Sequence, residues 1–214
     1  MNATLSTATP LPAILNQPAA AGPGRRHRIE NVALTRFDLD RFNNLLLRLG
    51  SRRPPLVCDQ LVTAARELCD CSMLAVEPPS IRERMHRVET AARMVNDRDW
   101  AAANDANDTA RLVVDYAAGS DNLIPDWVPK VGHLDDAIVI DAAWPRLADE
   151  IDDYLDFCRL RAFESATPAA SVPQRFNRGD WQRARREEAA LVAHQNSVRG
   201  HSYLAEPAAL FHVH

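Results

Sequence analysis

Residues 121–136 read DNLIPDWVPKVGHLDD, and this stretch decides how the chain folds. Pro125 and Pro129 fix the backbone φ angle and favour an extended preceding residue, so the stretch cannot lie inside a helix. Gly132 allows the chain to turn. Helical periodicity stops before the stretch, near Gly119, and resumes at its end. The sequence therefore predicts a structured connection between two helices.

The connection has too many apolar side chains for a solvated loop, so we expect it to pack across helix ends. Its apolar residues are Leu123, Ile124, Trp127, Val128 and Val131. Asp135 and Asp136 then fall in the first turn of the following helix, where the exposed N–H groups and the helix dipole favour negative charge.

Two interpretations of the acidic residues remain open. Carboxylates that converge from the loop and the helix start can bind Mg²⁺ or Ca²⁺ through oxygen ligands. Alternatively, Asp126 caps a turn and the two later aspartates cap a helix, with no ligand. The motif that is either structural or ligand-binding comprises Pro125, Asp126, Pro129, Gly132, His133, Asp135 and Asp136. The candidate metal ligands are Asp126, Asp135 and Asp136.

Apolar residues recur at three- and four-residue steps in most of the remaining chain, which predicts helices. The predicted helices span residues 38–49, 56–74, 80–95, 99–119, 134–163 and 180–197. Asp38 and Ser80 are the expected N-caps of the first and third, and Pro145 predicts a kink or a break in the fifth. Strand-like alternation never exceeds about four residues. We therefore expect an all-α fold, a small helical bundle with a proline- and glycine-containing connection.

The predicted organisation has four parts: a flexible Ala/Pro-rich leader (1–29), a helical domain (30–165), a linker (166–179) and a basic helical arm with a tail (180–214). No apolar run is long enough to cross a membrane, and the leader lacks the pattern of a secretory signal. The four cysteines show neither zinc nor redox spacing. These features predict a cytoplasmic protein.

The arm carries a local basic patch in a chain of net charge −4. The patch comprises Arg175, Arg178, Arg183, Arg185 and Arg186, interleaved with Phe176 and Trp181. Such a patch can bind phosphates and stack on bases, pair with the acidic helix face at 149–156, or contact anionic lipid. Glu187 and Glu188 dilute its charge, so we do not expect a nucleic-acid partner.

The pattern Leu-Ile-Pro-Asp-x-x-Pro-x-x-Gly-x-Leu-Asp-Asp at 123–136 resembles the signature of the YkvA-like family, a bacterial domain of unknown function. The resemblance covers about residues 105–145. It departs from the family at Asn122, where an aspartate is usual, and at Lys130 and His133, where an aliphatic and an aromatic residue are typical. The resemblance implies a helical domain without an established catalytic activity.

A non-enzymatic interaction or scaffold protein is the function that these features favour, with a protein partner or self-association and no required cofactor. The chain has no nucleophile elbow, phosphate-binding glycine loop or HExxH motif. One alternative is a divalent-metal-dependent hydrolase that uses Asp126, Asp135 and Asp136 with His133. The other is a peripheral membrane protein held by the apolar 123–131 segment and the basic arm.

Overall fold

The computed structural model describes residues 9–18, 26–71, 76–166 and 175–201. The regular secondary structure of this part of the chain is helical apart from one two-stranded ribbon, which confirms the all-α prediction. The chain divides into two compact units, Met1–Tyr154 and Leu155–His214. The division falls inside the longest helix, before the predicted linker.

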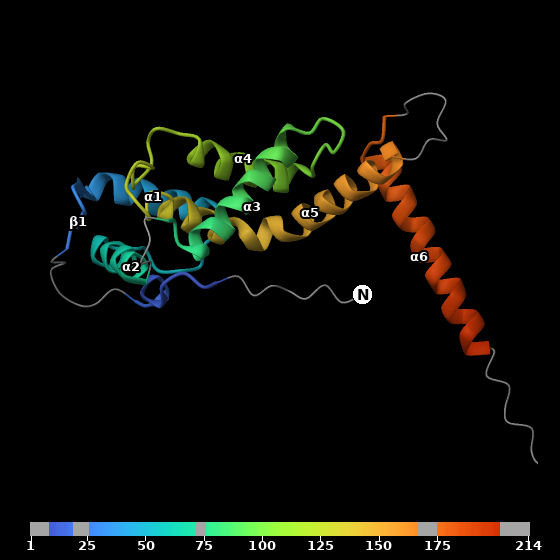
Figure 1. Cartoon of the computed structure of the whole chain (residues 1–214), viewed down its shortest axis with the longest axis horizontal. Helices are drawn as coiled ribbons and strands as arrows, with labels where there is room; N and C mark the ends of the chain where they lie inside the picture. Colours follow the sequence, from blue (N-terminus) through green and yellow to red (C-terminus); the bar gives the residue numbers. More distant parts are fainter. Residues whose placement is uncertain (1–8, 19–25, 72–75, 167–174, 202–214) are drawn as a thin grey trace, which may run out of the picture. The chain divides into compact units, whose positions relative to one another are not determined.

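The first unit contains most of the elements (Figure 1). In chain order they are η1 (Ala13–Asn16), β1 (Arg28–Ile29), β2 (Val32–Ala33), α1 (Arg36–Arg48), α2 (Cys58–Cys71), α3 (Pro79–Asn96), α4 (Asn104–Ala117) and the start of α5 (Leu134–Ala166). The two short strands pair antiparallel. The second unit holds the end of α5 and α6 (Arg178–His201).

Two predicted helix caps are wrong. The N-cap of α1 is Thr35, whose hydroxyl oxygen accepts a hydrogen bond from the Asp38 amide at 3.1 Å. Helix α3 begins at Pro79, because proline already has the φ angle that the first helical position requires and has no N–H to satisfy. Ser80 therefore lies inside the first turn of α3 instead of capping it.

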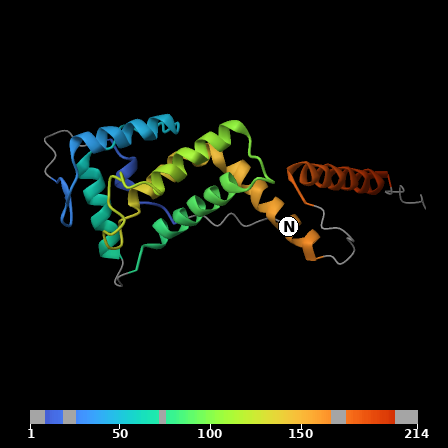
Figure 2. The ribbon, with the colours of Figure 1, turned by 90° about the horizontal axis from the view of Figure 1, so that it is seen from above.

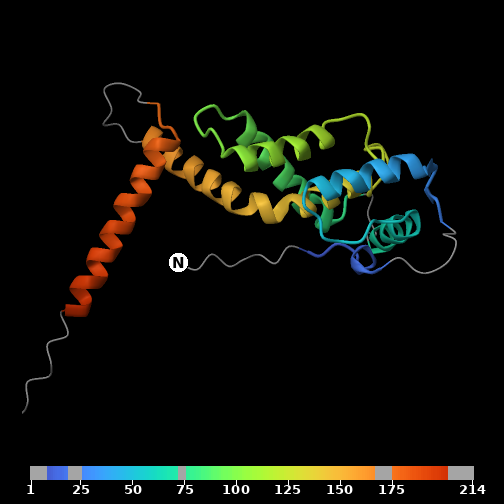
Figure 3. The same cartoon turned by 180° about the vertical axis from the view of Figure 1, so that it is seen from behind.

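Part of the predicted flexible leader is structured. Leu11 and Leu15 are 8% and 2% exposed, and η1 lies beside α2 (Figures 1 and 3). The Gln60 side chain of α2 donates hydrogen bonds to the carbonyls of Ile14 and Gln17, at 3.1 and 2.7 Å. The leader prediction is therefore wrong for residues 9–18, whose leucines provide apolar anchors between the prolines. The rest of the predicted leader up to residue 25 lies outside the described residues.

The start of α5 is the centre of the first unit, because every residue from 134 to 140 is buried. Helices α3 and α4 pack against each other in the same unit (Figure 2). Helix α5 continues through Pro145 without a break. No helix in the described residues is long and apolar enough to cross a membrane.

In the second unit, α6 contacts the end of α5 through one acidic residue, and the segment just before α6 contacts it through one aromatic pair. The Trp181 indole N–H donates to the Asp156 carboxylate at 2.7 Å, and the Arg185 guanidinium pairs with the same carboxylate. The rings of Phe157 and Phe176 stack with centroids 5.6 Å apart. Of the alternatives for the basic arm, pairing with the acidic helix face is thus seen at Asp156. The middle of the predicted linker (167–174) and the tail (202–214) lie outside the described residues.

Candidate functional site: the corner between α4 and α5

The connection between α4 and α5, residues 121–136, is hereafter called the corner. Its aliphatic side chains are almost completely buried, with Ile124 and Val131 at 0% exposure, and Trp127 alone among its apolar residues is largely exposed, at 68%. Backbone hydrogen bonds close its turns, from the Val128 amide to the Pro125 carbonyl at 2.9 Å and from the Gly132 amide to the Val128 carbonyl at 3.0 Å. The prediction of a packed connection is therefore confirmed.

Gly132 is required by a close approach of two backbone segments. A Cβ atom at this position would lie 2.4 Å from the carbonyl oxygen of Asp126, far inside van der Waals contact. The left-handed backbone conformation in the turn belongs to Lys130, with φ of +67°. The packing at Gly132 holds the Asp126 loop against the start of α5.

This packing brings together three side chains that can ligate a metal ion. One ligand atom each from Asp126, His133 and Asp136 lies within 4.8 Å of the others. Asp126 is exposed, His133 is half-buried and Asp136 is 1% exposed. Both carboxylate oxygens of Asp136 are buried and have no hydrogen-bond donor among the described residues. Helix capping therefore does not account for Asp136.

Asp135, the other predicted acidic ligand, points to different partners. One of its carboxylate oxygens accepts hydrogen bonds from the Tyr116 hydroxyl at 2.7 Å and from the Ile124 amide at 3.1 Å. The same hydroxyl oxygen of Tyr116 accepts from the Leu123 amide at 3.0 Å. Asp135 thus fixes the end of α4 and the corner to the start of α5, and it lies outside the three-residue group.

Glu77, just before α3, is a member of the site that the sequence did not predict. Its carboxylate lies 2.8 Å from Nδ1 of His133, which leaves Nε2 outside this hydrogen bond. A histidine that ligates a metal typically donates its other ring N–H to a carboxylate, which fixes the tautomer and the ring orientation. The two residues are 56 positions apart in the sequence, and nothing periodic in that stretch predicts their contact.

Asn122 completes the surroundings of Asp126. Its side-chain amide donates to the Asp126 carboxylate at 2.8 Å, while its own carbonyl oxygen is buried with no donor in the described part of the chain. One carboxylate oxygen of Asp135 is likewise buried and has no donor among the described residues. The corner therefore holds several buried acceptor oxygens that have no hydrogen-bond donor among the described residues.

The pKa values of the corner reflect its burial and its acidic neighbours. Burial, followed by the charges of Asp135 and Asp126, raises the pKa of Asp136 to about 7. Burial raises the pKa of Asp135 to about 6, although hydrogen bonds from Tyr116 and the backbone oppose the rise. Burial lowers the pKa of His133, but the hydrogen bond with Glu77 and the acidic neighbours outweigh it, so that the net shift is upward.

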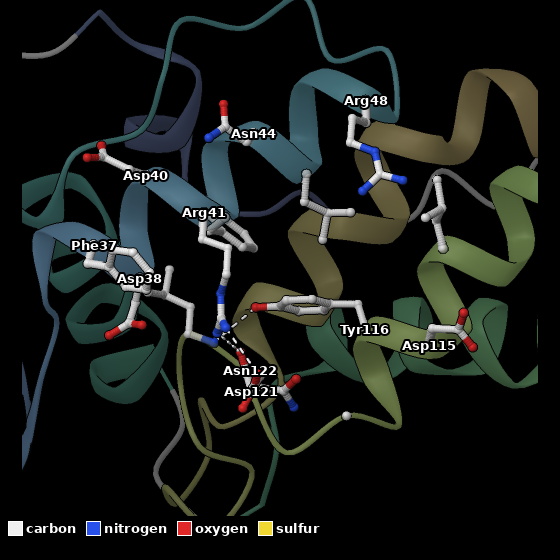
Figure 4. Close-up of a pocket in the computed structure, with 15 residues that line it drawn as sticks. Phe37, Asp38, Asp40, Arg41, Asn44, Arg48, Asp115, Tyr116, Asp121 and Asn122 are labelled. Carbon is white, nitrogen blue, oxygen red and sulfur yellow. Dashed lines mark hydrogen bonds and ion pairs between the residues drawn. The ribbon is translucent and has the colours of Figure 1, made fainter.

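Next to the corner, the first unit has a cavity of about 600 Å³ between α1 and α4 (Figure 4). Tyr116, Asp121 and Asn122 line its lower part, so that the cavity and the corner share one stretch of backbone. Asp121 forms an ion pair with Arg41 at 3.0 Å. None of the three metal-ligating candidates lines the cavity.

The predicted basic patch is partly engaged within the second unit. Arg185 binds Asp156 and Glu188, Arg183 lies 3.4 Å from Asp180, and Arg186 donates to the Gln182 carbonyl. Every described side chain from 186 to 199 is exposed.

No protein-family model, curated protein or solved structure matches this chain. The resemblance to the YkvA-like family thus rests on the corner motif at 123–136.

Proposed function

We propose that this chain is a non-enzymatic helical scaffold whose corner binds one divalent cation through Asp126, His133 and Asp136. The observation that carries the proposal is the Asp136 carboxylate, which is 1% exposed and whose oxygens have no donor in the part of the chain that the structure describes. A buried charge without a partner is strongly destabilising. A cation bound between Asp136 and its two neighbours would neutralise it.

The donor set indicates which cations fit. Carboxylates alone suit Mg²⁺ and Ca²⁺, whereas an imidazole ligand suits first-row transition metals. One histidine with two aspartates therefore favours Mn²⁺, Fe²⁺ or Zn²⁺ over the Mg²⁺ or Ca²⁺ that the carboxylates by themselves suggest. The Glu77 contact supports this choice, because it is the kind of partner that ligating histidines have.

The role of the cation in this proposal is structural. His133 directly precedes α5, Asp136 lies in its buried first turn, and Asp126 belongs to the loop that Gly132 holds against them. A cation shared by these residues would lock the loop to the central helix. The partner-binding part of the proposal is supported by α6, whose exposed stretch includes Leu191, Val192 and Val198 at 57%, 48% and 49% exposure.

Thermal unfolding of the full-length protein tests the cation site. After treatment with a chelator, Mn²⁺ or Zn²⁺ should raise the melting temperature more than Mg²⁺ or Ca²⁺ at equal concentration. At 100 times its dissociation constant, a specific ion stabilises by about 2.7 kcal/mol. The rise should shrink as the pH falls below 7, because protons compete for Asp136 and His133.

Asp136→Asn separates loss of the site from loss of the fold. This variant removes the unpaired buried charge but keeps the size of the side chain, so in chelator we expect it to be at least as stable as the wild type. It should lose the metal-dependent rise. Asp115→Asn, an exposed aspartate of α4, is the matched control and should keep the rise. A wild type that responds to none of the four ions, or an equal response in Asp136→Asn, contradicts the proposal.

A metal-dependent hydrolase is the second candidate, because three protein ligands leave coordination positions for water and substrate. Asp126 and His133 are the accessible members of the group. Turnover of p-nitrophenyl phosphate by the Mn²⁺-loaded wild type, absent in Asp136→Asn, would favour this candidate. The membrane alternative has less support, because the apolar side chains of 123–131 are buried except Trp127.

A further inference from the structure

The cavity between α1 and α4 has a lining that suits an elongated apolar molecule. Facing stripes of the two helices form its walls, with Phe42 and Leu45 from α1 and Leu112 and Tyr116 from α4. Leu123 of the corner adds a further apolar side chain. A volume of about 600 Å³ lies within the usual range of small-molecule sites.

The cavity is lined by two arginines and four aspartates, namely Arg41, Arg48, Asp38, Asp40, Asp115 and Asp121, and these groups differ in how they are engaged. The Asp38 carboxylate accepts a hydrogen bond from the Thr35 hydroxyl. The Arg41 guanidinium is held by Asp121, pairing with its carboxylate at 3.0 Å and donating to its backbone carbonyl. The Arg48 guanidinium has no hydrogen-bond or ion-pair partner within the described ranges. Figure 4 shows it projecting from α1 toward the space between the helices, whereas Asp40 and Asp115 point away from that space.

We propose that this cavity binds a monocarboxylate with an apolar body, such as a medium-chain fatty acid. The carboxylate would pair with Arg48, whose planar guanidinium matches carboxylate geometry with two parallel hydrogen bonds. The alkyl chain of the ligand would lie against the apolar side chains that line the cavity. Because none of the cation-site residues lines the cavity, the two proposals stand or fall separately.

Three probes with the same eight-carbon chain test the charge of the head group. They are octanoate, octyltrimethylammonium and octyl phosphate, each titrated into the full-length protein and followed by amide chemical shifts. Octanoate should bind most tightly and perturb residues 41–48 and 112–123. Tighter binding of octyltrimethylammonium or octyl phosphate, perturbations confined to other elements, or no binding of octanoate up to its solubility limit would overturn the proposal.

The variant Arg48→Gln tests the proposed contact between Arg48 and the ligand carboxylate. Arg48 is exposed, so we expect the variant to fold, and its octanoate affinity should fall about tenfold, equivalent to about 1.4 kcal/mol. Its affinity for octyltrimethylammonium should not fall. Arg36→Gln, an exposed arginine of the same helix outside the cavity lining, is the matched control and should bind octanoate as the wild type does. Unchanged octanoate binding by Arg48→Gln would show that Arg48 does not bind the carboxylate.

Discussion

At Asp136 the chain places a carboxylate in the buried first turn of α5 and provides no donor for it within the described structure. Asp135, the preceding residue, is equally buried but accepts hydrogen bonds from Tyr116 and Ile124. The two residues have the same side chain and similar burial, and they differ in whether a donor faces the carboxylate. This difference makes Asp135 a structural residue and Asp136 the residue on which the cation proposal depends.

Gly132 is the residue whose substitution tests how tightly the corner is packed. Gly132→Ala should destabilise the protein by about 1–3 kcal/mol in urea unfolding, the usual cost of forcing extra atoms into a packed site. The added Cβ would meet the Asp126 carbonyl, a backbone atom that cannot rotate away. The Gly132→Ala substitution should also weaken cation binding, because it moves Asp126 away from His133 and Asp136.

Gly179→Ala is the control for this effect. At Gly179 the nearest atom to an added Cβ is the Asn177 side-chain oxygen at 3.0 Å, which accepts hydrogen bonds from the Gly179 and Asp180 amides but belongs to a side chain that can shift. We expect a smaller loss of stability than for Gly132→Ala in the same unfolding experiment. A Gly132→Ala protein as stable as the wild type would mean that the Asp126 loop is free to shift, and the corner would then not be the rigid unit described above.

At the scale of elements, α6 is held to the end of α5 by a charged contact that depends on pH. Burial alone would raise the pKa of Asp156, but hydrogen bonds from Arg185 and Trp181 outweigh it and hold the pKa below its usual range. A carboxyl group with a lowered pKa in the folded state stabilises that state at higher pH. This contribution is present above the ordinary aspartate pKa of about 4 and is lost as the pH falls through the lowered value.

The Trp181 indole N–H resonance reports this contact directly. We expect its chemical shift to be constant from pH 7 down to about 5 and to change below about 4, as Asp156 takes up a proton. Asp156→Asn should shift the resonance at every pH, because the amide is a weaker acceptor for the indole. Asp152→Asn, an exposed neighbour on the same helix, should leave it unchanged. A wild-type resonance that titrates near pH 6 would assign the contact to another group.

At the scale of the whole molecule, the two units differ in how their helices are stabilised. The start of α5 is buried on every side, whereas α6 exposes all described side chains from 186 to 199. A helical segment whose side chains are exposed gains little stability from tertiary packing and is marginally stable in water. Amide hydrogen exchange should therefore be much faster over 186–199 than over 134–143.

A bound cation should act on only one of the units. In hydrogen exchange with Mn²⁺ and with chelator, we expect Mn²⁺ to slow exchange over the corner and the first turns of α5, because the ion links Asp126 to His133 and Asp136. Exchange over 186–199 should be the same in both conditions. Slowing in α6 at equal or greater extent would indicate that the ion binds to the arm instead.

The sequence by itself determined the helical fold class, the approximate position of every long helix and the structured corner between α4 and α5. These features follow from local physics, namely helical periodicity, the fixed φ angle of proline and the freedom of glycine. The same local rules misplaced the caps of α1 and α3, because Thr35 caps α1 and Pro79 already starts α3 before the predicted cap Ser80. They also missed the order of residues 9–18, which depends on contacts with the distant α2.

Only the tertiary structure decided what each acidic residue of the corner does. Asp126, Asp135 and Asp136 were equivalent candidates in the sequence, and the donors that distinguish them come from Tyr116 and from the turn of the corner itself. Glu77 reaches His133 across 56 residues, and Arg48 faces α4 across the cavity. Such relations depend on how the helices pack against one another, and side-chain spacing along one helix carries no record of that packing.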